Sequence, residues 1–281
     1  MIIAQYFVEF IFYSFLGWIW ESIYCSAKEH KWADRGFLFG PVCPIYGSAV
    51  VLTSVIFGGI SALSSPDFPI WGIFIICYIG SVVLEFGTSW VLEKRFHARW
   101  WDYSYMPLNI QGRICVPVST AFGIVGVFVV RYLIPTIEGM HEVIPTIIYE
   151  VLAIILAMAF GADYALTEAS LSALLKNVEE MHREFNEHAQ TNYEKLAGTP
   201  RLIKGKLREE KDLMELRYEA FTKAYAERMS FNQRRLLLAI HSFTSRRGDS
   251  IDTIDLKNRL SEHLKVRVRG LRKKHDRKDN K

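Results

Sequence analysis

The chain has 281 residues, of which 50% are hydrophobic and 23% are charged, and its formal net charge is +4. These averages combine two parts. Residues 1–170 are 60% apolar with a net charge of −5, whereas residues 171–281 are 35% apolar with a net charge of +9. This division excludes a single soluble globule, a disulfide-stapled secreted module and a disordered protein.

The N-terminal part is apolar from its first residues. No Lys or Arg precedes the first apolar run and no small-residue cleavage site follows it, which favours a retained helix over a removable signal peptide. The cysteines form no C-x-x-C pair, so they indicate neither a zinc site nor a redox site, and we interpret them as small apolar residues. They are Cys25, Cys43, Cys77 and Cys115.

Five apolar runs in residues 1–170 are long enough to cross a bilayer, which takes about 20 helical residues. Pro44, Pro69 and Pro145 lie at or just before the start of a run, where a proline is tolerated, whereas Pro117 lies about one turn inside the fourth run. The sequence therefore predicts an all-α, polytopic membrane bundle of five transmembrane helices. Their expected positions are residues 2–25, 42–63, 70–92, 114–134 and 146–166.

Loop charge predicts the orientation of these helices. The loops after the first and third runs are basic, whereas those after the second and fourth hold no Lys or Arg. Because basic loops stay in the cytoplasm, we expect an outside N-terminus and a cytoplasmic C-terminus. Arg131, near the outer end of the fourth run, is the exception, and we expect it to snorkel to the interface. The basic loop residues are Lys28, Lys31, Arg35, Lys94, Arg95, Arg99 and Arg113.

Residues 171–281 are predicted to form a helical cytoplasmic extension. Apolar residues at three- and four-residue spacing from Leu171 to Phe185 indicate a short amphipathic helix that continues the last span until Gly198-Thr199-Pro200. A second helix is predicted from Leu207 to Phe243, and a third after Gly248.

The chain ends in a basic run from Lys265 to Lys281. This composition is typical of a solvated tail, and it also suits contact with anionic lipid headgroups. Aromatic residues are not interleaved with the basic ones, so we expect no nucleic-acid binding.

Charged residues inside the predicted spans are the first candidate site. Glu21 lies in the last third of the first span, Glu85 in the last third of the third span, and Arg113 at the start of the fourth. A carboxylate in hydrocarbon costs at least about 2.5 kcal/mol, so it faces a partner or a cavity. The three side chains could form a cytoplasm-facing polar pocket for a cation, a proton or a zwitterion, with Arg113 as counter-charge. They could equally satisfy one another as a buried cluster that fixes helix packing. Asp163, near the inner end of the last span, is placed at the same depth.

The loop after the third span is the second candidate site, with His97, Arg99, Trp100, Trp101 and Asp102 as its binding residues. The aromatic rings are typical of an interfacial belt, and a ligand cage is the alternative. His97 and Asp102 could handle a proton or hold a metal, although a single His in an aromatic loop is more often a hydrogen-bonded interfacial residue. The loop after the first span is punctuated by Gly and Pro, which predicts a tightly shaped re-entrant turn.

Several loop segments carry a family resemblance. They are Arg-Gly-Phe-Leu-Phe-Gly-Pro at 35–41, Cys-Pro-Ile-Tyr-Gly at 43–47, Leu-Glu-Lys at 92–94, Phe-His-Ala-Arg-Trp-Trp-Asp-Tyr-Ser at 96–104 and Gly-Arg-Ile-Cys at 112–115. Together they resemble the signature segments of the bacterial family named putative ABC-transporter type IV. The resemblance covers residues 6–165 and implies a multi-pass bacterial membrane protein that acts as an ABC-transporter permease.

The chain has no G-x-x-x-x-G-K-[ST] phosphate loop and no hydrolase motif, so we expect neither enzymatic activity nor a cofactor, and ATP-driven transport would require a separate ATPase subunit. The leading hypothesis is a permease-like component of a bacterial inner membrane. The second is a non-transporting scaffold or regulator that anchors its helical tail to a partner, and the third is a membrane enzyme that uses His97 and Asp102. Because five spans are few for a transport path, a homodimer is also plausible.

Overall fold

The computed structural model describes residues 2–29, 36–65, 67–141, 143–197, 216, 219–220, 222–224 and 226–243. The chain divides into two compact units, Met1–Thr167 and Glu168–Lys281. Several predicted features lie outside the described residues: Lys31 and Arg35 of the first basic loop, the break at Gly198-Thr199-Pro200, the third helix after Gly248 and the basic run from Lys265 to Lys281.

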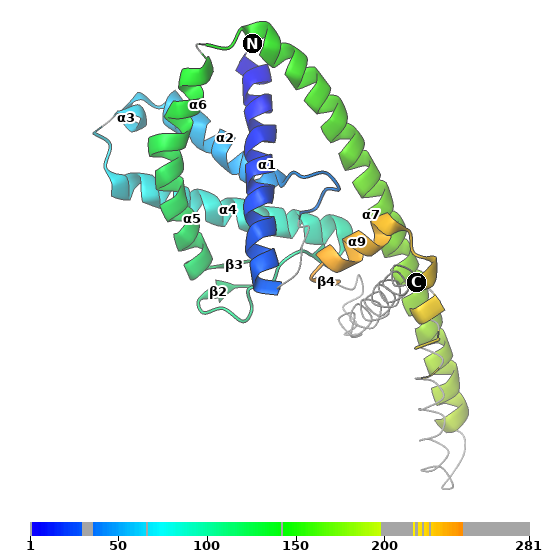
Figure 1. Ribbon diagram of the computed structural model, residues 1–281. Coiled ribbons are helices and arrows are strands. Elements are labelled where there is room, and N and C mark those ends of the chain that lie inside the picture. The colour runs from blue at the N-terminus through cyan, green and yellow to red at the C-terminus, as the bar shows by residue number, and fades with distance from the viewer. Residues whose placement is uncertain are drawn as a thin grey trace, which may run out of the picture. The chain divides into compact units, whose positions relative to one another are not determined.

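Helices dominate the first unit (Figure 1). Its strands are only two residues long and all follow α4. In chain order the elements are α1 (Ile2–Glu29), α2 (Pro44–Gly59), α3 (Ser61–Ser64), α4 (Ile70–Phe96), β1 (Ala98–Arg99), β2 (Asn109–Ile110), β3 (Ile114–Cys115), α5 (Val116–Phe128), the π-helical turn η1 (Val129–Leu133), α6 (Ile134–His141) and α7 (Thr146–Ala197).

Within the described residues, four helical stretches are long and apolar enough to cross a membrane, namely Ile2–Ala27, Ile70–Phe96, Val116–His141 and Thr146–Val178. The helical membrane bundle predicted from the sequence is therefore confirmed. The predicted second span is shorter than expected, because α2 has 16 residues. At 1.5 Å per residue it covers about 24 Å, against a hydrocarbon core of about 30 Å. Extended backbone at Ile60 ends α2, and the four-residue α3 follows.

Prolines fix where the helices begin. Pro44 occupies the first turn of α2, and Pro69 and Pro145 directly precede α4 and α7. Pro117 also falls in the first turn of its helix, because Ile114 and Cys115 form β3 rather than the predicted start of the fourth span. That span instead continues beyond Ile134 to His141, through η1.

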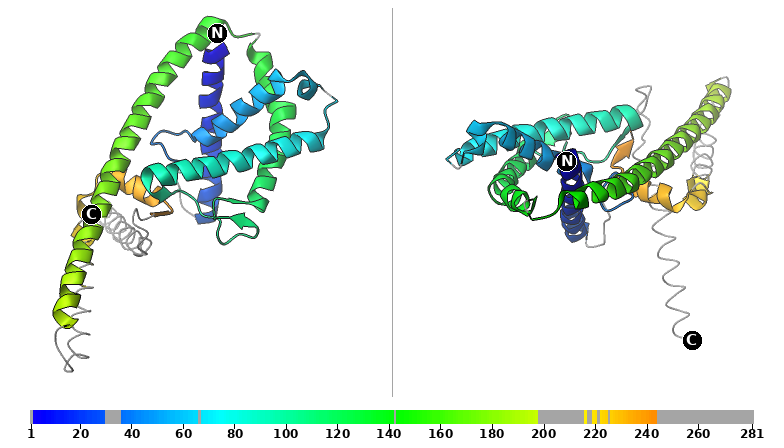
Figure 2. Two further views of the ribbon diagram at one scale, coloured as in Figure 1. Left: turned by 180° about the vertical axis from the view of Figure 1, so that it is seen from behind. Right: turned by 90° about the horizontal axis from the view of Figure 1, so that it is seen from above.

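Close helix packing in the first unit depends on small residues. Gly47 of α2 lies against the Phe10 carbonyl and the Ser14 side chain of α1, and Gly17 of α1 lies beneath the ring of Tyr46. Gly123 and Gly126 of α5 accommodate Phe74 and Cys77 of α4 in the same way. The best-packed helix pairs are accordingly α1 with α2 and α4 with α5 (Figure 2). Small interfacial residues are the usual device for bringing membrane helices together.

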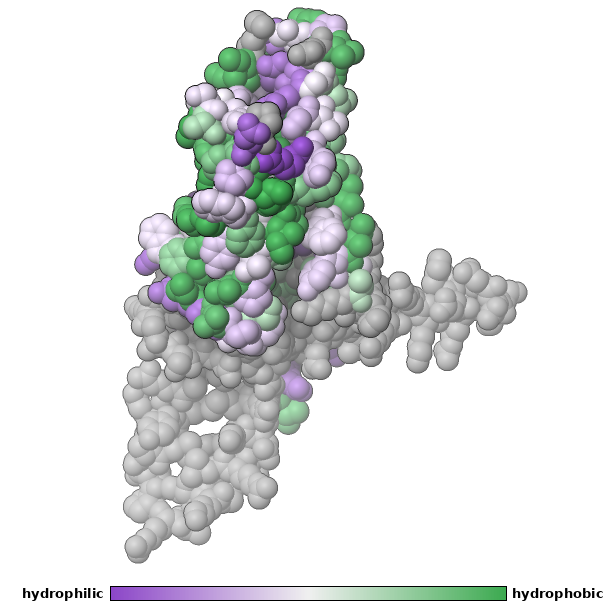
Figure 3. Space-filling view, turned by 90° about the vertical axis from the view of Figure 1, so that its left-hand side faces the viewer, coloured by the Kyte–Doolittle hydropathy of each residue, from purple (hydrophilic) through white to green (hydrophobic). Residues whose placement is uncertain are grey.

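Large apolar side chains remain exposed on the long helices, as Ile79, Ile124 and Ile154 illustrate. The described face in Figure 3 is correspondingly hydrophobic over much of its area, with a hydrophilic patch in its upper part. In a soluble protein such a surface would be an aggregation hazard, whereas in a bilayer it contacts lipid.

The second unit contains the end of α7 and a short helix, α9 (Phe231–Ala239), followed by strand β4 (Ser242–Phe243). Leu171 and Leu174 on α7, and Leu236 and Leu237 on α9, are fully buried. The amphipathic continuation of the last span is therefore present as part of one unbroken helix.

The predicted second helix, from Leu207 to Phe243, is wrong at its C-terminal end. Ser230 interrupts it and caps α9, since its hydroxyl accepts from the Gln233 N–H while the Gln233 side chain accepts from the Ser230 N–H. Phe243 lies in an extended strand. The sequence Ser-Phe-Asn-Gln at 230–233 is a capping box that apolar periodicity alone does not register.

Candidate functional site

Of the two carboxylates singled out in the sequence, Glu85 contacts Tyr103 and Glu21 lies near it. Glu85 is buried on α4, and the Tyr103 hydroxyl donates a hydrogen bond of 3.4 Å to its Oε1. Burial raises the pKa of Tyr103, and the negative charges of Glu85 and Glu21 raise it further, which places both carboxylates near the phenol. Tyr103 therefore stays protonated and acts as a hydrogen-bond donor.

The second oxygen of Glu85 is buried and accepts no hydrogen bond from the part of the chain that the structure describes. The same holds for the Ser22 hydroxyl, one residue after Glu21. A buried polar atom without a partner costs about 1 to 3 kcal/mol. Such atoms beside two carboxylates indicate a place for water, a proton or the polar group of a solute.

Arg113 is also buried, but its ion pair is with Glu93 rather than with the predicted partners. Its guanidinium lies 2.7 Å from Glu93 Oε2 and donates to Ser89 Oγ at 3.2 Å. It also lies over the ring of Phe86, 5.6 Å from the centroid. Glu93, at the end of α4, is thus the ion-pair partner of Arg113, whereas the sequence predicts Arg113 as the counter-charge of Glu21 and Glu85.

Glu93 holds a second arginine as well. Arg99 Nε lies 2.7 Å from Glu93 Oε2, and Arg99 Nη1 donates to the carbonyl of Gln111 at 3.2 Å. One carboxylate therefore ties the end of α4 to both sides of the loop that follows, and this clip fixes the loop near Glu85.

The loop itself is built around a tight turn between β2 and β3, which pair antiparallel. Gln111 and Gly112 both have positive φ, at 54° and 68°. A side chain on Gly112 would overlap the Asp102 carboxylate, so glycine is required there. Trp101 Nε1 donates to the Arg113 carbonyl at 2.9 Å, and the Tyr103 N–H donates to the Gly112 carbonyl at 2.7 Å. These bonds hold Tyr103 beside Glu85.

His97 and Asp102 have local structural roles. His97 ends α4 in the left-handed conformation, with φ 48°, and its N–H donates to the Glu93 carbonyl. Asp102 Oδ1 accepts from both the N–H and the hydroxyl of Ser104. These contacts give both residues a part in the folding of the loop that follows α4.

Trp100 is half-buried and packs against Phe37 and Phe96, at centroid distances of 5.4 and 6.2 Å. Phe37 also contacts Tyr164 of α7. The aromatic residues therefore join the two basic loops to α7, and the ring of Trp100 is not arranged as the wall of an open cage.

Asp163 holds the loop between α1 and α2. Its two oxygens accept from the N–H groups of Phe39 and Gly40, at 3.0 and 2.9 Å. The backbone of Gly40 lies close to the Asp163 carboxylate, because a side chain at this position would meet the carboxylate. Leu38 is fully buried beside these bonds. Residues 36–41 thus form an ordered turn pinned to α7.

Sequence reasoning missed Glu9, which is 6% exposed on α1. Its Oε1 lies 3.0 Å from His141 Nε2 at the end of α6. The available signal was its position: a carboxylate about one-third of the way along the first apolar run, one turn before Tyr13.

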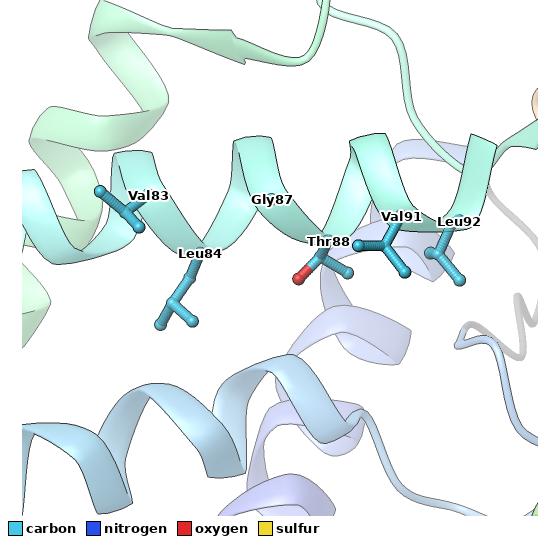
Figure 4. A pocket seen from close by; sticks show the side chains of 6 residues that line it. All are labelled: Val83, Leu84, Gly87, Thr88, Val91 and Leu92. Atoms are coloured by element: carbon cyan, nitrogen blue, oxygen red, sulfur yellow. The ribbon is translucent and has the colours of Figure 1, made fainter. Parts of the chain in front are cut away.

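Two further features do not add to this site. A shallow apolar hollow is lined by residues of α4 alone, with side chains on one side of the helix (Figure 4): Val83, Leu84, Gly87, Thr88, Val91 and Leu92. Among the described residues, no group of three or more His, Cys, Asp or Glu side chains is arranged to hold a metal ion.

Comparison with known proteins identifies the family. The family described as "Putative ABC-transporter type IV" matches residues 8–168, which is more than half of the chain and covers α1 to α7 of the first unit. A search of curated proteins and a search of solved structures gave no match. The matched region contains Glu21, Glu85, Tyr103 and Arg113, together with four apolar helices of membrane-spanning length. The chain is therefore a multi-pass membrane protein and belongs to the putative ABC-transporter type IV family.

Proposed function

We propose that this protein is the permease-like membrane component of a bacterial ABC-type transporter, and that Glu21, Glu85 and Tyr103 form its solute site. The observation that carries the proposal is the hydrogen bond from Tyr103 to the buried Glu85, within reach of the charge of Glu21 on another helix, with one oxygen of Glu85 unpartnered among the described residues. Family membership supports the transporter class.

The charges favour a cationic or zwitterionic solute, or a proton. Arg113 is engaged by Glu93, so Glu21 and Glu85 carry the charge of the site. Tyr103 donates to Glu85, which leaves the second carboxylate oxygen to accept from a donor of the solute. A buried carboxylate is stabilised by a cation, since an unpaired charge in this environment is costly.

ATP hydrolysis would come from a separate subunit, because the chain has no phosphate-binding loop. The loop from His97 to Arg113 is a suitable docking surface, since the clip through Glu93 makes it rigid. A rigid loop can transmit the movement of an ATPase to Glu85, which lies two turns before the clip on the same helix.

Contacts within the first unit support five membrane crossings, with α2 as a short one. Arg131 of the fourth span donates to the Phe68 carbonyl just before α4, and Glu9 of α1 meets His141 at the end of α6. Asp163 of α7 holds Phe39 and Gly40 in the loop after α1. Five crossings would put the loops before α4 and α7 on one side of the membrane and the loops after α1 and α4 on the other. The positive-inside rule then puts the N-terminus outside and the C-terminus in the cytoplasm of a bacterial inner membrane.

Uptake by membrane vesicles tests the solute site. We would energise inside-out and right-side-out vesicles of the native membrane with ATP and follow radiolabelled rubidium, choline and glycine betaine. At least one probe should move faster with the wild-type chain than without it, and Glu85→Gln should abolish that movement. The proposal fails if no probe moves, or if Glu85→Gln transports at the wild-type rate while inserting normally.

The scaffold hypothesis is a second candidate, favoured by α7. This helix runs unbroken for 52 residues, from the membrane into the second unit, where Leu171 and Leu174 are buried. Such a helix could anchor a partner to the membrane. Deleting residues 171–281 should then remove the cellular phenotype while Glu85→Gln leaves it unchanged, the opposite of what a transport role predicts.

The remaining partner hypotheses concern residues or contacts outside the described structure. The basic run from Lys265 to Lys281 would bind anionic lipid headgroups next to the membrane. A homodimer would complete the transport path if one chain supplies too few helices.

A further inference from the structure

Carboxyl and phenol side chains form a row along α1, which we call the file. Glu9, Tyr13, Gly17 and Glu21 are spaced four residues apart, so they lie along one side of the helix over about 18 Å. The only apolar member is a glycine, and the ring of Tyr46 from α2 lies over it. The stripe therefore bears a carboxyl or hydroxyl group at each turn.

One end of the file is a polar cluster that the proposed solute site does not use. Glu9 is buried and meets His141 at 3.0 Å, and the ring of His141 contacts that of Tyr149 on α7, with centroids 5.2 Å apart. Glu138 on α6 is close enough for its charge to act on the hydroxyl of Tyr13. Among the described residues, the titratable groups near Glu9 are thus Tyr13, Glu138, His141 and Tyr149.

The middle of the file contains hydroxyls that packing alone does not explain. Tyr13 is only 2% exposed, and its hydroxyl has no hydrogen-bond partner within the described ranges. The adjacent Ser14 hydroxyl is equally buried and unpartnered there. Tyr46 lies near both Glu21 and Glu85, whose charges act on its hydroxyl. Buried hydroxyls persist without a partner only at a free-energy cost, so their retention points to a use.

The other end is the solute site. Tyr103 donates to Glu85 and lies within reach of the charge of Glu21, and both the second oxygen of Glu85 and the hydroxyl of Ser22 are buried and unpartnered in the described chain. Groups that can both accept and donate a proton therefore follow one another from Glu9 to Glu85.

We propose that this file is a proton pathway through the membrane unit, with Glu9 and His141 at one end and Glu21 and Glu85 at the other. A proton taken up by Glu9 passes along hydroxyls and intervening water, each hydroxyl accepting one proton and releasing its own, and a proton leaves from Glu85. After each cycle the chain holds the same number of protons as before, and one proton, with its positive charge, has crossed the membrane unit. The pathway shares Glu21 and Glu85 with the proposed solute site, but it requires no ATPase and no organic solute.

Proton flux through the purified full-length chain tests this pathway. The chain is reconstituted alone, without ATP, into liposomes that contain the pH dye pyranine, and a potassium gradient with valinomycin drives proton movement. The pH of the lumen should change several times faster in liposomes that contain the wild-type chain than in protein-free liposomes. Glu9→Gln and Glu85→Gln should each return the rate to the protein-free background.

Tyr13→Phe is the most informative variant, because it removes only a hydroxyl that has no partner in the described chain. It should fold at least as well as the wild type and conduct protons at least fivefold more slowly. Tyr132→Phe is its matched control, since Tyr132 is exposed on η1, and its flux should equal the wild-type flux. Equal flux from Tyr13→Phe and Tyr132→Phe would overturn the pathway, as would wild-type flux at background. Neither result would affect an ATP-driven solute transport, which is measured separately.

Discussion

Gly47 shows how a single residue sets the spacing of the membrane helices. A Cβ at this position would overlap the Phe10 carbonyl and the Ser14 side chain, so α2 approaches α1 as closely as its backbone permits. Gly58, on the same helix, has open space around it. Both glycines therefore lie in the same helix, but only Gly47 is closely packed.

Gly47→Ala should destabilise the protein by about 1 to 3 kcal/mol, because an added methyl group must push the two helices apart. Gly58→Ala should be neutral or stabilising by up to about 1 kcal/mol, since alanine favours a helix. Thermal unfolding in detergent micelles compares the variants. If both midpoints equal that of the wild type, the helices do not pack as described.

Glu93, near the end of α4, holds the following loop in place through two ion pairs. Its carboxylate contacts the guanidinium groups of Arg99 and Arg113, both at 2.7 Å, and the side chain of Arg113 is only 8% exposed. Removing this carboxylate would leave a buried cation without its ion-pair partner.

Glu93→Gln should therefore lower the free energy of unfolding by about 2 to 3 kcal/mol, somewhat below the range for a fully buried pair. Glu180→Gln removes an exposed ion pair with Lys176 and should cost less than about 0.5 kcal/mol. Chemical or thermal unfolding in the same detergent gives both values. Equal effects of the two substitutions would show that the clip contributes nothing.

Residue types and their depth in the apolar runs indicated Glu21, Glu85 and Arg113 as a candidate site, but not how their side chains pair. Arg113 reaches Glu93 because the β2–β3 turn folds the chain back on α4, and that turn depends on positive φ at Gln111 and Gly112. Long-range geometry of this kind has no periodic signal in the sequence. Glu9 was missed although its depth was visible, since its partner His141 lies more than 130 residues away.

At the scale of elements, the prolines predict the starts of the helices most accurately. Each of Pro44, Pro69 and Pro145 marks the start of a helix. Apolar periodicity was less informative where a cap interrupts it, and the predicted helix that ends at Phe243 is divided by Ser230. Hydropathy also overestimated the second span, because it cannot register the extended backbone at Ile60 that ends α2.

Ser230→Ala tests the cap of α9. Loss of the hydrogen bond from the Gln233 N–H to the Ser230 hydroxyl should destabilise the first turn by about 1 kcal/mol and increase amide exchange there about fivefold. Ser172→Ala, at an exposed position within α7, should leave exchange unchanged or slower, since alanine is the better helix former. Hydrogen exchange followed by mass spectrometry measures both. Unchanged exchange in α9 would mean that Ser230 does not begin the helix.

At the scale of the whole molecule, the helix ends of the membrane unit carry different contacts. Glu9 pairs with His141 at the end of α6 and Arg131 donates to the Phe68 carbonyl before α4, whereas Asp163 and Glu93 hold the loops that follow α1 and α4. The proposed topology puts the loop before α4 and the loop after it on opposite sides of the membrane. It requires α2 to cross despite its 16 residues.

Cysteine labelling tests this arrangement. In a background with the four native cysteines replaced by alanine, Asp67→Cys should react with a membrane-impermeant maleimide added outside intact spheroplasts, and Ser104→Cys should react only after the membrane is opened. Both positions are solvent-exposed, so their reactivity reports the side of the membrane. External labelling of Ser104→Cys, or protection of Asp67→Cys, would contradict the proposed topology.

Purification of the tagged full-length chain from its own membrane decides whether it works as a transporter component. If the chain is a permease, an ATPase subunit with a phosphate-binding loop should copurify in a fixed ratio, and the preparation should hydrolyse ATP. The ATPase should also copurify with the Glu85→Gln variant, because that residue lies in the solute site rather than on the docking surface. A preparation that contains no ATPase and retains a soluble partner only while residues 171–281 are present would contradict the permease assignment and support the scaffold.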